Sequence, residues 1–213
     1  MAEPEKGVRD FNSERVLSLF MSCKSDNEDL SIKYYTDAYE ELCKLFPLLG
    51  TVFSFVTSDV VEKIKILQDY IKSSEGEHYQ TIQAMVNYEV KNNLTIQKKK
   101  ASGCRTLLRL HRALEFISAL LARIRDTDNT CKFSTEATIV YDKTLGIFHP
   151  WLVRKAVHVA MYTLPTRHQL LLKMGVEDTP EGMKKMNSLI KQLDHVYEIT
   201  QNVYASNNLL DLP

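Results

Sequence analysis

The chain has 213 residues, of which 44% are hydrophobic and 25% are charged, and its 27 basic residues balance 27 acidic ones. This length and composition are typical of one folded domain with a sizeable core. The zero formal net charge argues against a nucleic-acid-binding protein, because such proteins normally carry a basic excess. No run of 18 apolar residues is present, so the sequence predicts no transmembrane helix.

The cysteines and the chain ends set further limits. No two cysteines are close enough for a C-x-x-C motif, and the first residues lack the apolar core of a signal peptide. We therefore expect reduced thiols in a cytosolic protein, and with no lipidation motif any membrane contact is expected to be peripheral. We also expect a flexible N-terminus over 1–10 and a single domain over 11–213. The four cysteines are Cys23, Cys43, Cys104 and Cys131.

Apolar residues recur with helical spacing along most of the chain, whereas glycine is rare and Asn-Gly hairpin turns are absent. The breaks between these segments are short, and none is typical of a linker between domains. The sequence therefore predicts one all-α domain of about eight or nine helices. In chain order the predicted helices cover 16–21, 34–46, 59–71, 82–90, 105–124, 136–147, 150–163, 165–174 and 184–205.

The helix predicted over 105–124 has an unusual stripe beside its ordinary apolar face. Three arginines lie within about 60° of one another around the helix axis, and the same stripe continues as apolar side chains. An amphiphile with an anionic head and a hydrocarbon tail would match this gradient, because a guanidinium group suits phosphate. The alternative is a solvated charged face, which is common on helices. The stripe consists of Arg105, Arg109, Arg112, Phe116 and Leu120.

Asp59 and Lys63 lie one helical turn apart in the predicted helix over 59–71. One interpretation is an aspartate that accepts from an amide N–H and a hydroxyl, beside a lysine that binds phosphate. Two structural alternatives remain open. Asp59 followed by Glu62 fits a helix N-cap with an acidic N3 residue, and Asp59 with Lys63 fits a routine surface ion pair.

His149 and the only tryptophan, Trp151, lie just before the basic pair Arg154 and Lys155. Tryptophan favours the membrane–water boundary, so Trp151 beside basic residues is consistent with an interfacial anchor. A tryptophan in the core, flanked by surface charges, is the alternative. A lone histidine is more often a structural residue than a ligand, and the pattern alone leaves the role of His149 open.

Taken together and in this order, these segments resemble the glycolipid transfer protein superfamily, in particular its members that carry phosphorylated ceramides. The resemblance extends from about residue 16 to the end of the sequence. The segments that carry it are 49–55 with 59–63, 103–114, 149–157 with 163–167, and 209–213.

The resemblance implies a two-layer helical sandwich with a hydrophobic pocket for the lipid chains. It implies that Asp59 takes the amide N–H of the sphingoid base and that His149 donates to the acyl carbonyl. Sugar-binding members carry a tryptophan that stacks on the sugar where this sequence has Arg109. With Lys63 and Arg105, this arginine is expected to surround a phosphate.

The function implied is that of a non-enzymatic, monomeric carrier of ceramide-1-phosphate. We expect it in the cytosol, peripherally and reversibly bound at Golgi, plasma or endosomal membranes, with no cofactor and no metal. Arg112 is kept apart from the phosphate set. The basic loop 98–100 is a candidate secondary contact with phosphate, and Trp151 is expected to dock on membranes. Candidate gate residues by position are Phe53, Phe55 and Val56.

Three other functions remain as alternatives. A lipid hydrolase that uses His149 and Asp59 would turn over its substrate, although no G-x-S-x-G, P-loop or H-E-x-x-H motif is present. A helical protein-interaction module would hold no sphingolipid. A carrier of glycosylated lipids is disfavoured by Arg109.

Overall fold

The computed structural model describes residues 11–25, 27–97 and 101–213. The segment 1–10, expected to be flexible, and the basic loop 98–100 lie outside these residues. The described chain contains ten α-helices and three 3-10 helices. In order these are α1 (Ser13–Cys23), α2 (Ile32–Leu42), α3 (Leu45–Leu49), η1 (Thr51–Phe53), α4 (Ser54–Ile71), η2 (Gly76–Tyr79), α5 (Ile82–Lys91), α6 (Gly103–Asp126), α7 (Phe133–Lys143), η3 (Leu145–Phe148), α8 (Trp151–Met161), α9 (Arg167–Lys173) and α10 (Pro180–Ser206).

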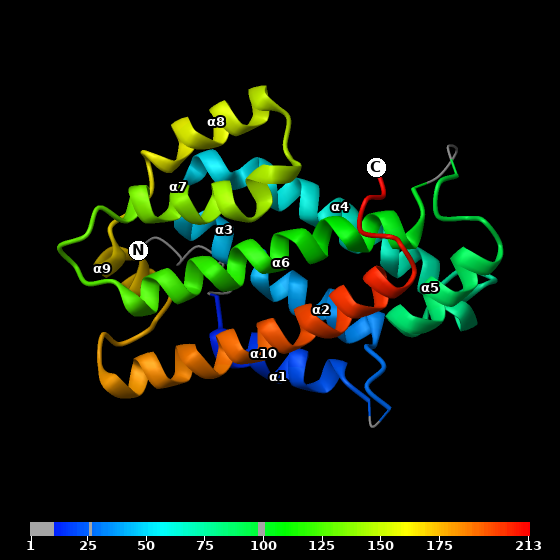
Figure 1. Ribbon diagram of the computed structural model, residues 1–213. Coiled ribbons are helices and arrows are strands. Elements are labelled where there is room, and N and C mark those ends of the chain that lie inside the picture. The colour runs from blue at the N-terminus through cyan, green and yellow to red at the C-terminus, as the bar shows by residue number, and fades with distance from the viewer. Residues whose placement is uncertain (1–10, 26, 98–100) are drawn as a thin grey trace, which may run out of the picture.

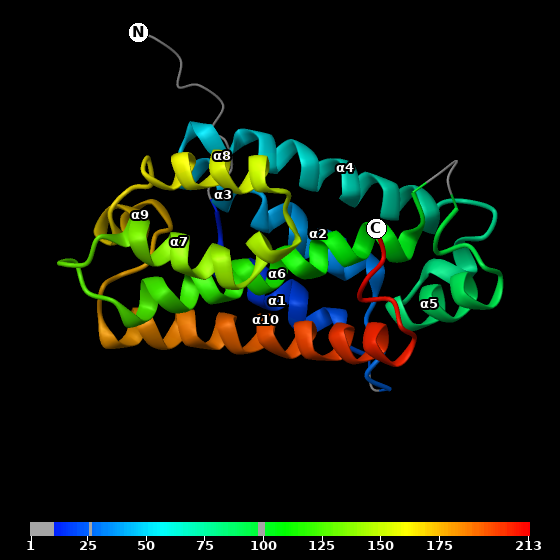
Figure 2. The ribbon, with the colours of Figure 1, turned by 45° about the horizontal axis from the view of Figure 1, so that its top comes forward.

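The helices form a two-layer sandwich, as predicted (Figure 1). One layer contains α7, α6 and α10, and the other contains α4, α2 and α1. The layers meet where α4 packs on α6 and where α1 packs on α10 (Figure 2). Helix α8 packs on α7, at the side of the molecule away from α10. None of the described helices is long and apolar enough to cross a bilayer.

Short polar side chains fix where several helices begin. Ser102 accepts from the backbone N–H of Arg105 and so caps α6, and a cap of this kind contributes about 1 kcal/mol. Glu89 reinforces the same end, because its buried carboxylate accepts from the backbone N–H groups of Gly103 and Cys104. These contacts anchor the turn of α6 from which the predicted cationic stripe starts.

The predicted helix over 34–46 is two helices, α2 and α3. Pro47 explains the division, because proline has no N–H to donate to the carbonyl of Cys43 and its ring crowds that carbonyl. The predicted start of the next helix at Asp59 is also wrong. Helix α4 begins at Ser54, directly after the 3-10 turn Thr51–Phe53.

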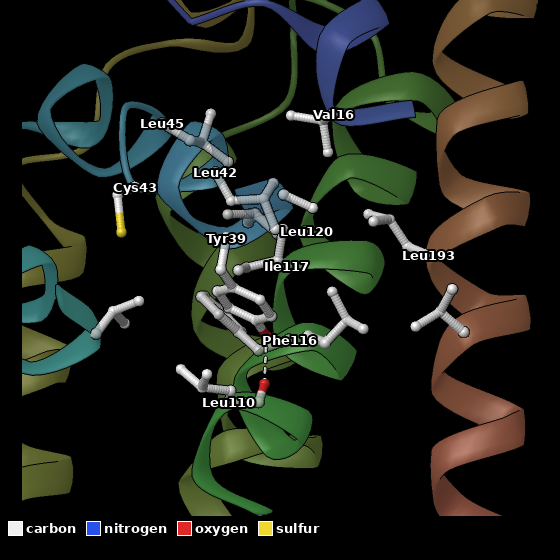
Figure 3. Packing of buried hydrophobic residues seen from close by; sticks show 14 of the residues in the cluster. Val16, Tyr39, Leu42, Cys43, Leu45, Leu110, Phe116, Ile117, Leu120 and Leu193 are labelled. Carbon is white, nitrogen blue, oxygen red and sulfur yellow. Dashed lines mark hydrogen bonds between the residues drawn. The ribbon is translucent and has the colours of Figure 1, made fainter. Parts of the chain in front are cut away.

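The core lies between the two layers and contains side chains from α1, α2, α3, α6 and α10 (Figure 3). Tyr39 lies fully buried at the centre of this core, and its hydroxyl donates a hydrogen bond to the backbone carbonyl of Leu110. This bond satisfies a polar group that would otherwise be costly to bury. It also fixes α2 against α6 beside the region where the core opens into a cavity.

Candidate functional site

A cavity of about 280 Å³ lies between α4 and α6 and is also lined by side chains of α3, α7 and α8. Its interior is almost entirely apolar. Leu110, Ala113 and Ile117, on the ordinary apolar face of α6, line this cavity, and Leu110 and Ile117 also belong to the buried core. Further apolar side chains around it are Phe46, Leu49, Val60, Phe116, Val157 and Met161.

Polar side chains from three distant segments meet in the lining of the same cavity: Asp59 and Lys63 of α4, Arg109 of α6, and His149 before α8. Lys63 Nζ lies 2.6 Å from Asp59 Oδ1. The lysine side chain is only 14% exposed, whereas that of the aspartate is 61% exposed. The predicted ion pair therefore exists, but it lies against an apolar cavity and is not an isolated surface contact. The alternative of Asp59 as a helix N-cap is wrong, because Asp59 lies inside α4.

A second hollow of about 220 Å³ adjoins the cavity and shares Lys63 and Arg109 with it. Arg105 is the third cation of this lining. It lies one helical turn before Arg109, so both arginines are on the same face of α6. Glu62 is the acidic member of this lining. Three cations thus surround a space that opens directly beside the apolar cavity.

The two arginines of this hollow differ in their partners. Arg105 Nε donates to the carbonyl oxygen of Pro213 at 3.1 Å, and its Nη1 lies 3.5 Å from the carbonyl oxygen of Gln97. These two main-chain acceptors orient the guanidinium. Arg109 is exposed and forms no hydrogen bond or ion pair with any residue in the described ranges. Its donors are therefore available to an anion.

His149 lies half-buried at the edge of the cavity, and its Nδ1 is 2.7 Å from the hydroxyl of Tyr141. Burial lowers the pKa of His149, and Arg109 lowers it further while Asp59 opposes the shift. The ring is therefore mainly neutral at physiological pH. No cluster of three histidine, cysteine, aspartate or glutamate side chains suited to a metal occurs within the described residues.

A cavity of this kind between two helical layers, with a cationic hollow beside it, suits an anionic amphiphile, and comparison with known proteins identifies the family. The family model described as glycolipid transfer protein matches residues 30–176. The chain belongs to the glycolipid transfer protein family. Proteins of this family share the fold expected from the sequence, and the match covers every segment that lines the cavity.

Individual relatives match along nearly their whole lengths. The chain is 42% identical to the ceramide-1-phosphate transfer protein of Danio rerio, over 95% of this chain and 98% of that protein. The crystal structure of the human ceramide-1-phosphate transfer protein in complex with 12:0 ceramide-1-phosphate superposes with a TM-score of 0.89 at 36% identity, covering 95% of this chain and all of that one. The apo-form of the mouse protein gives a TM-score of 0.90 at 39% identity, covering 96% of this chain and all of that one.

Arg112 continues the cationic stripe but faces a different part of this family member. Its Nη2 donates to the carbonyl oxygen of Leu210 at 2.7 Å, and its guanidinium lies 4.0 Å from the ring centre of Phe148. Burial lowers its pKa, and Arg109 adds to this effect. Arg112 is absent from the linings of both the cavity and the hollow, in keeping with its exclusion from the predicted phosphate set.

The three candidate gate residues all line the cavity but differ in exposure. Phe53 is buried, Val56 is partly buried, and Phe55 is 55% exposed. Gly50 precedes them with a φ of +128°, a conformation that residues with a side chain rarely adopt. The chain therefore changes direction immediately before the segment that borders the cavity.

Trp151 lies outside the cavity lining and is 69% exposed, so the alternative of a core tryptophan is wrong. Lys155 Nζ lies 5.9 Å from the centre of its ring. Other exposed apolar side chains occur in the same part of the chain. Together with Trp151 we call them the α8 face: Ile147, Phe148, Leu152, Val159 and Tyr162.

The sequence patterns did not reveal Tyr141, which lines the cavity and contacts His149. The available signal was its place on the buried face of α7 with Ala137 and Val140, eight residues before the histidine. That signal indicates burial, and only the turn Leu145–Phe148 brings the two side chains together.

Proposed function

We propose that this chain binds ceramide-1-phosphate and carries it between membranes without changing it chemically. The observation that carries the proposal is the junction of an apolar cavity with a hollow lined by three cations. An amphiphile with a phosphate head and hydrocarbon tails complements both parts. The relatives named ceramide-1-phosphate transfer protein, one of them bound to that lipid, support the same assignment.

The phosphate would lie in the hollow between Lys63, Arg105 and Arg109. Guanidinium groups bind phosphate oxygens through charge-assisted hydrogen bonds, often two at a time. The cations exceed the carboxylates of the lining, which suits a headgroup that carries between one and two negative charges near pH 7. Arg109 would supply the strongest new interaction, because the protein itself does not occupy its donors.

The amide of the lipid would lie between Asp59 of α4 and His149, which precedes α8; both residues line the cavity. Asp59 would accept from the amide N–H, and His149 would donate to the acyl carbonyl. Binding would change the partner of Lys63 from Asp59 alone to Asp59 and phosphate together. Whatever the charge of the imidazole, this arrangement requires that the ring nitrogen facing the lipid carries a hydrogen.

The hydrocarbon chains would enter the apolar cavity, where each buried CH₂ contributes about 0.8 kcal/mol. A volume of 280 Å³ lies just below the range of about 300–1,000 Å³ typical of small-ligand pockets. Two long chains therefore require the surrounding helices to move apart. Phe53, Phe55 and Val56 border the cavity, where a gate would act.

The headgroup site would also decide which lipids are refused. Uncharged ceramide or a glycosylceramide would cover the three cations without neutralising them, and partly buried charges without partners are costly. Arg109 lacks the flat apolar surface that a tryptophan offers to a sugar ring. We expect a carrier with a strong preference for the phosphorylated lipid.

Docking on membranes would use the α8 face, whose exposed apolar side chains lie on and next to α8, the helix that also supplies Val153 and Val157 to the cavity lining. Trp151 suits the bilayer interface, and Lys155 would face lipid phosphates. We propose reversible contact with cytosol-facing membranes, such as Golgi, plasma or endosomal membranes.

A transfer experiment with product analysis tests this function. Donor vesicles containing ceramide-1-phosphate would be mixed with acceptor vesicles and the protein, and the lipids of both populations identified by mass spectrometry. We expect intact ceramide-1-phosphate in the acceptors at a rate that depends on protein concentration. Conversion to ceramide would indicate the hydrolase alternative, and absence of both movement and bound lipid would favour the interaction module.

A further inference from the structure

The contact between Tyr141 and His149 fixes more than the position of the ring. The Tyr141 hydroxyl lies 2.7 Å from Nδ1 of His149, and the phenol is buried. Burial raises the pKa of Tyr141 to about 12, so the phenol keeps its proton near neutral pH. Nε2 of His149 forms no hydrogen bond within residues 11–25, 27–97 and 101–213. One ring nitrogen is therefore engaged by the protein and the other is left for a ligand.

The turn between α7 and α8 is built to make this contact. A Cβ atom at Gly146 would lie 2.7 Å from the backbone oxygen of Tyr141 and 3.1 Å from its ring. Only glycine permits the turn to pack so closely on the tyrosine. The backbone N–H of His149 then donates to the carbonyl of Gly146 at 3.2 Å, which returns the histidine toward Tyr141.

The chemistry of this pair selects one tautomer of the neutral imidazole. A neutral histidine has one nitrogen that donates and one that accepts. If Nδ1 carried the proton, it would donate to the phenol oxygen, and the buried phenol O–H would have no acceptor among the described residues. If Nδ1 instead accepts from Tyr141, both groups are satisfied. The proton of the neutral ring then lies on Nε2.

We propose that Tyr141 is a positioning residue that donates to Nδ1 of His149 and thereby keeps the imidazole proton on Nε2, the atom that donates to the acyl carbonyl of the lipid amide. This inference rests on the proposed function, which assigns His149 to that carbonyl. An amide requires one acceptor for its N–H and one donor for its oxygen, and Asp59 supplies only the acceptor. The other tautomer would place a lone pair of His149 against the carbonyl oxygen.

Several charged or titratable groups surround the pair and must be considered in any pH experiment. The wild-type protein and a variant that changes only Tyr141 share all of them, so the ratio of their transfer rates at each pH removes most of their influence. The same ratio also cancels the effect on transfer of protonating the lipid phosphate, whose second pKa is about 6. The groups are Asp59 of α4, Arg109 of α6, Asp142 of α7, and Arg154 and His158 of α8.

The test is Tyr141→Phe, which removes the hydroxyl and keeps the ring that packs edge-on against Phe116. Ring ¹⁵N NMR of lipid-free protein reports the tautomer directly, with the His149 signals assigned through His149→Gln. We expect one Nε2–H tautomer in the wild-type protein and a mixture in the variant. Transfer of ceramide-1-phosphate by the variant should be slower at pH 8 by the inverse of the Nε2–H fraction that the NMR signals give, which is about twofold for an equal mixture. The ratio should approach one at low pH, because an imidazolium carries a proton on Nε2 in either case.

Tyr204→Phe is the matched control, because it also removes a buried phenol hydrogen bond, to the carbonyl of Cys104, away from His149. It should leave the His149 tautomer and the pH dependence of the ratio unchanged. An Nδ1–H tautomer in wild-type protein would overturn the proposal even if Tyr141→Phe did not fold. A pH-independent loss in Tyr141→Phe would also overturn it, since a purely structural defect behaves that way. Normal transfer by His149→Ala, which has no side-chain donor, would instead refute the assignment of His149 to the lipid while leaving the measured tautomer intact.

Discussion

Replacing Arg109 with leucine tests the phosphate site most sharply, because the structure separates its effect on binding from its effect on folding. Arg109 is exposed and makes no hydrogen bond or ion pair within the described part of the chain. Surface substitutions of this kind change stability by less than about 0.5 kcal/mol. The unfolding midpoint of Arg109→Leu should therefore match that of the wild-type protein.

Binding should respond very differently. A hydrogen bond to a charged group contributes about 1.5–3 kcal/mol, and two such bonds to phosphate would contribute at least about 3 kcal/mol. Since each 1.4 kcal/mol is a factor of ten, ceramide-1-phosphate should bind roughly a hundredfold more weakly. Its transfer between vesicles, followed by fluorescence, should be nearly abolished. The preference over uncharged ceramide should shrink in the same variant.

Arg123→Leu is the matched control, because it removes an arginine of the same helix that lies outside both linings and pairs with Glu136 at 3.2 Å. It should transfer ceramide-1-phosphate at the wild-type rate. Normal transfer by Arg109→Leu would refute the proposed phosphate site. Loss of folding in Arg109→Leu would contradict the structural argument that its side chain is unpaired.

Three further predictions concern docking, folding and pH. Trp151→Ala should leave the denaturation curve unchanged, because the side chain is exposed, but should weaken binding in vesicle sedimentation; unaltered binding would exclude Trp151 as an anchor. Glu89→Ala should destabilise the protein by about 3 kcal/mol in urea unfolding, because two buried N–H groups at the start of α6 lose their charged acceptor; a change below about 0.5 kcal/mol would contradict this. Burial lowers the pKa of His111 to about 4, so the folded state disfavours the charged imidazole. The neutral ring therefore contributes about 3 kcal/mol to the free energy of unfolding above about pH 6.5, and this contribution is lost as the pH falls toward 4. In His111→Gln the free energy of unfolding should vary less with pH over that window. An unchanged pH dependence would show that other groups cause the loss of stability.

Much of the fold could be predicted because local signals agree with packing. Helix α6 shows this best, since its apolar period, its Ser102 cap and its buried face all appear in the sequence. The undivided helix over 34–46 was an avoidable error, because Pro47 cannot donate to Cys43. The start of α4 was harder to place, since the backbone leads from a 3-10 turn into Ser54 without a side-chain cap.

The site was only partly predictable from residue patterns. The stripe with Arg105 and Arg109 follows from helical spacing, but its meeting with Asp59 and His149 depends on how three separate segments pack. The family resemblance supplied that juxtaposition. No spacing rule indicates that Arg105 is oriented by Pro213 or that Tyr141 contacts His149. Both contacts depend on tertiary structure that the local sequence does not specify.

The α8 face shows a similar limit. The composition around Trp151 allowed either a buried or an exposed ring, because the flanking basic residues suit both. The exposed fraction of 69% decides the question. If docking uses the α8 face as proposed, a lipid that leaves a membrane there would have a short path into the cavity beside α8.

Parallel transfer of fluorescent ceramide-1-phosphate and of a fluorescent glycosylceramide with the same acyl chain tests the central claim most directly. Both lipids present the same hydrocarbon to the cavity, so only the headgroup site can separate them. The account predicts rapid movement of the phosphorylated lipid and little movement of the glycosylated one. Faster transfer of the glycosylceramide would contradict the assignment of Lys63, Arg105 and Arg109 to a phosphate.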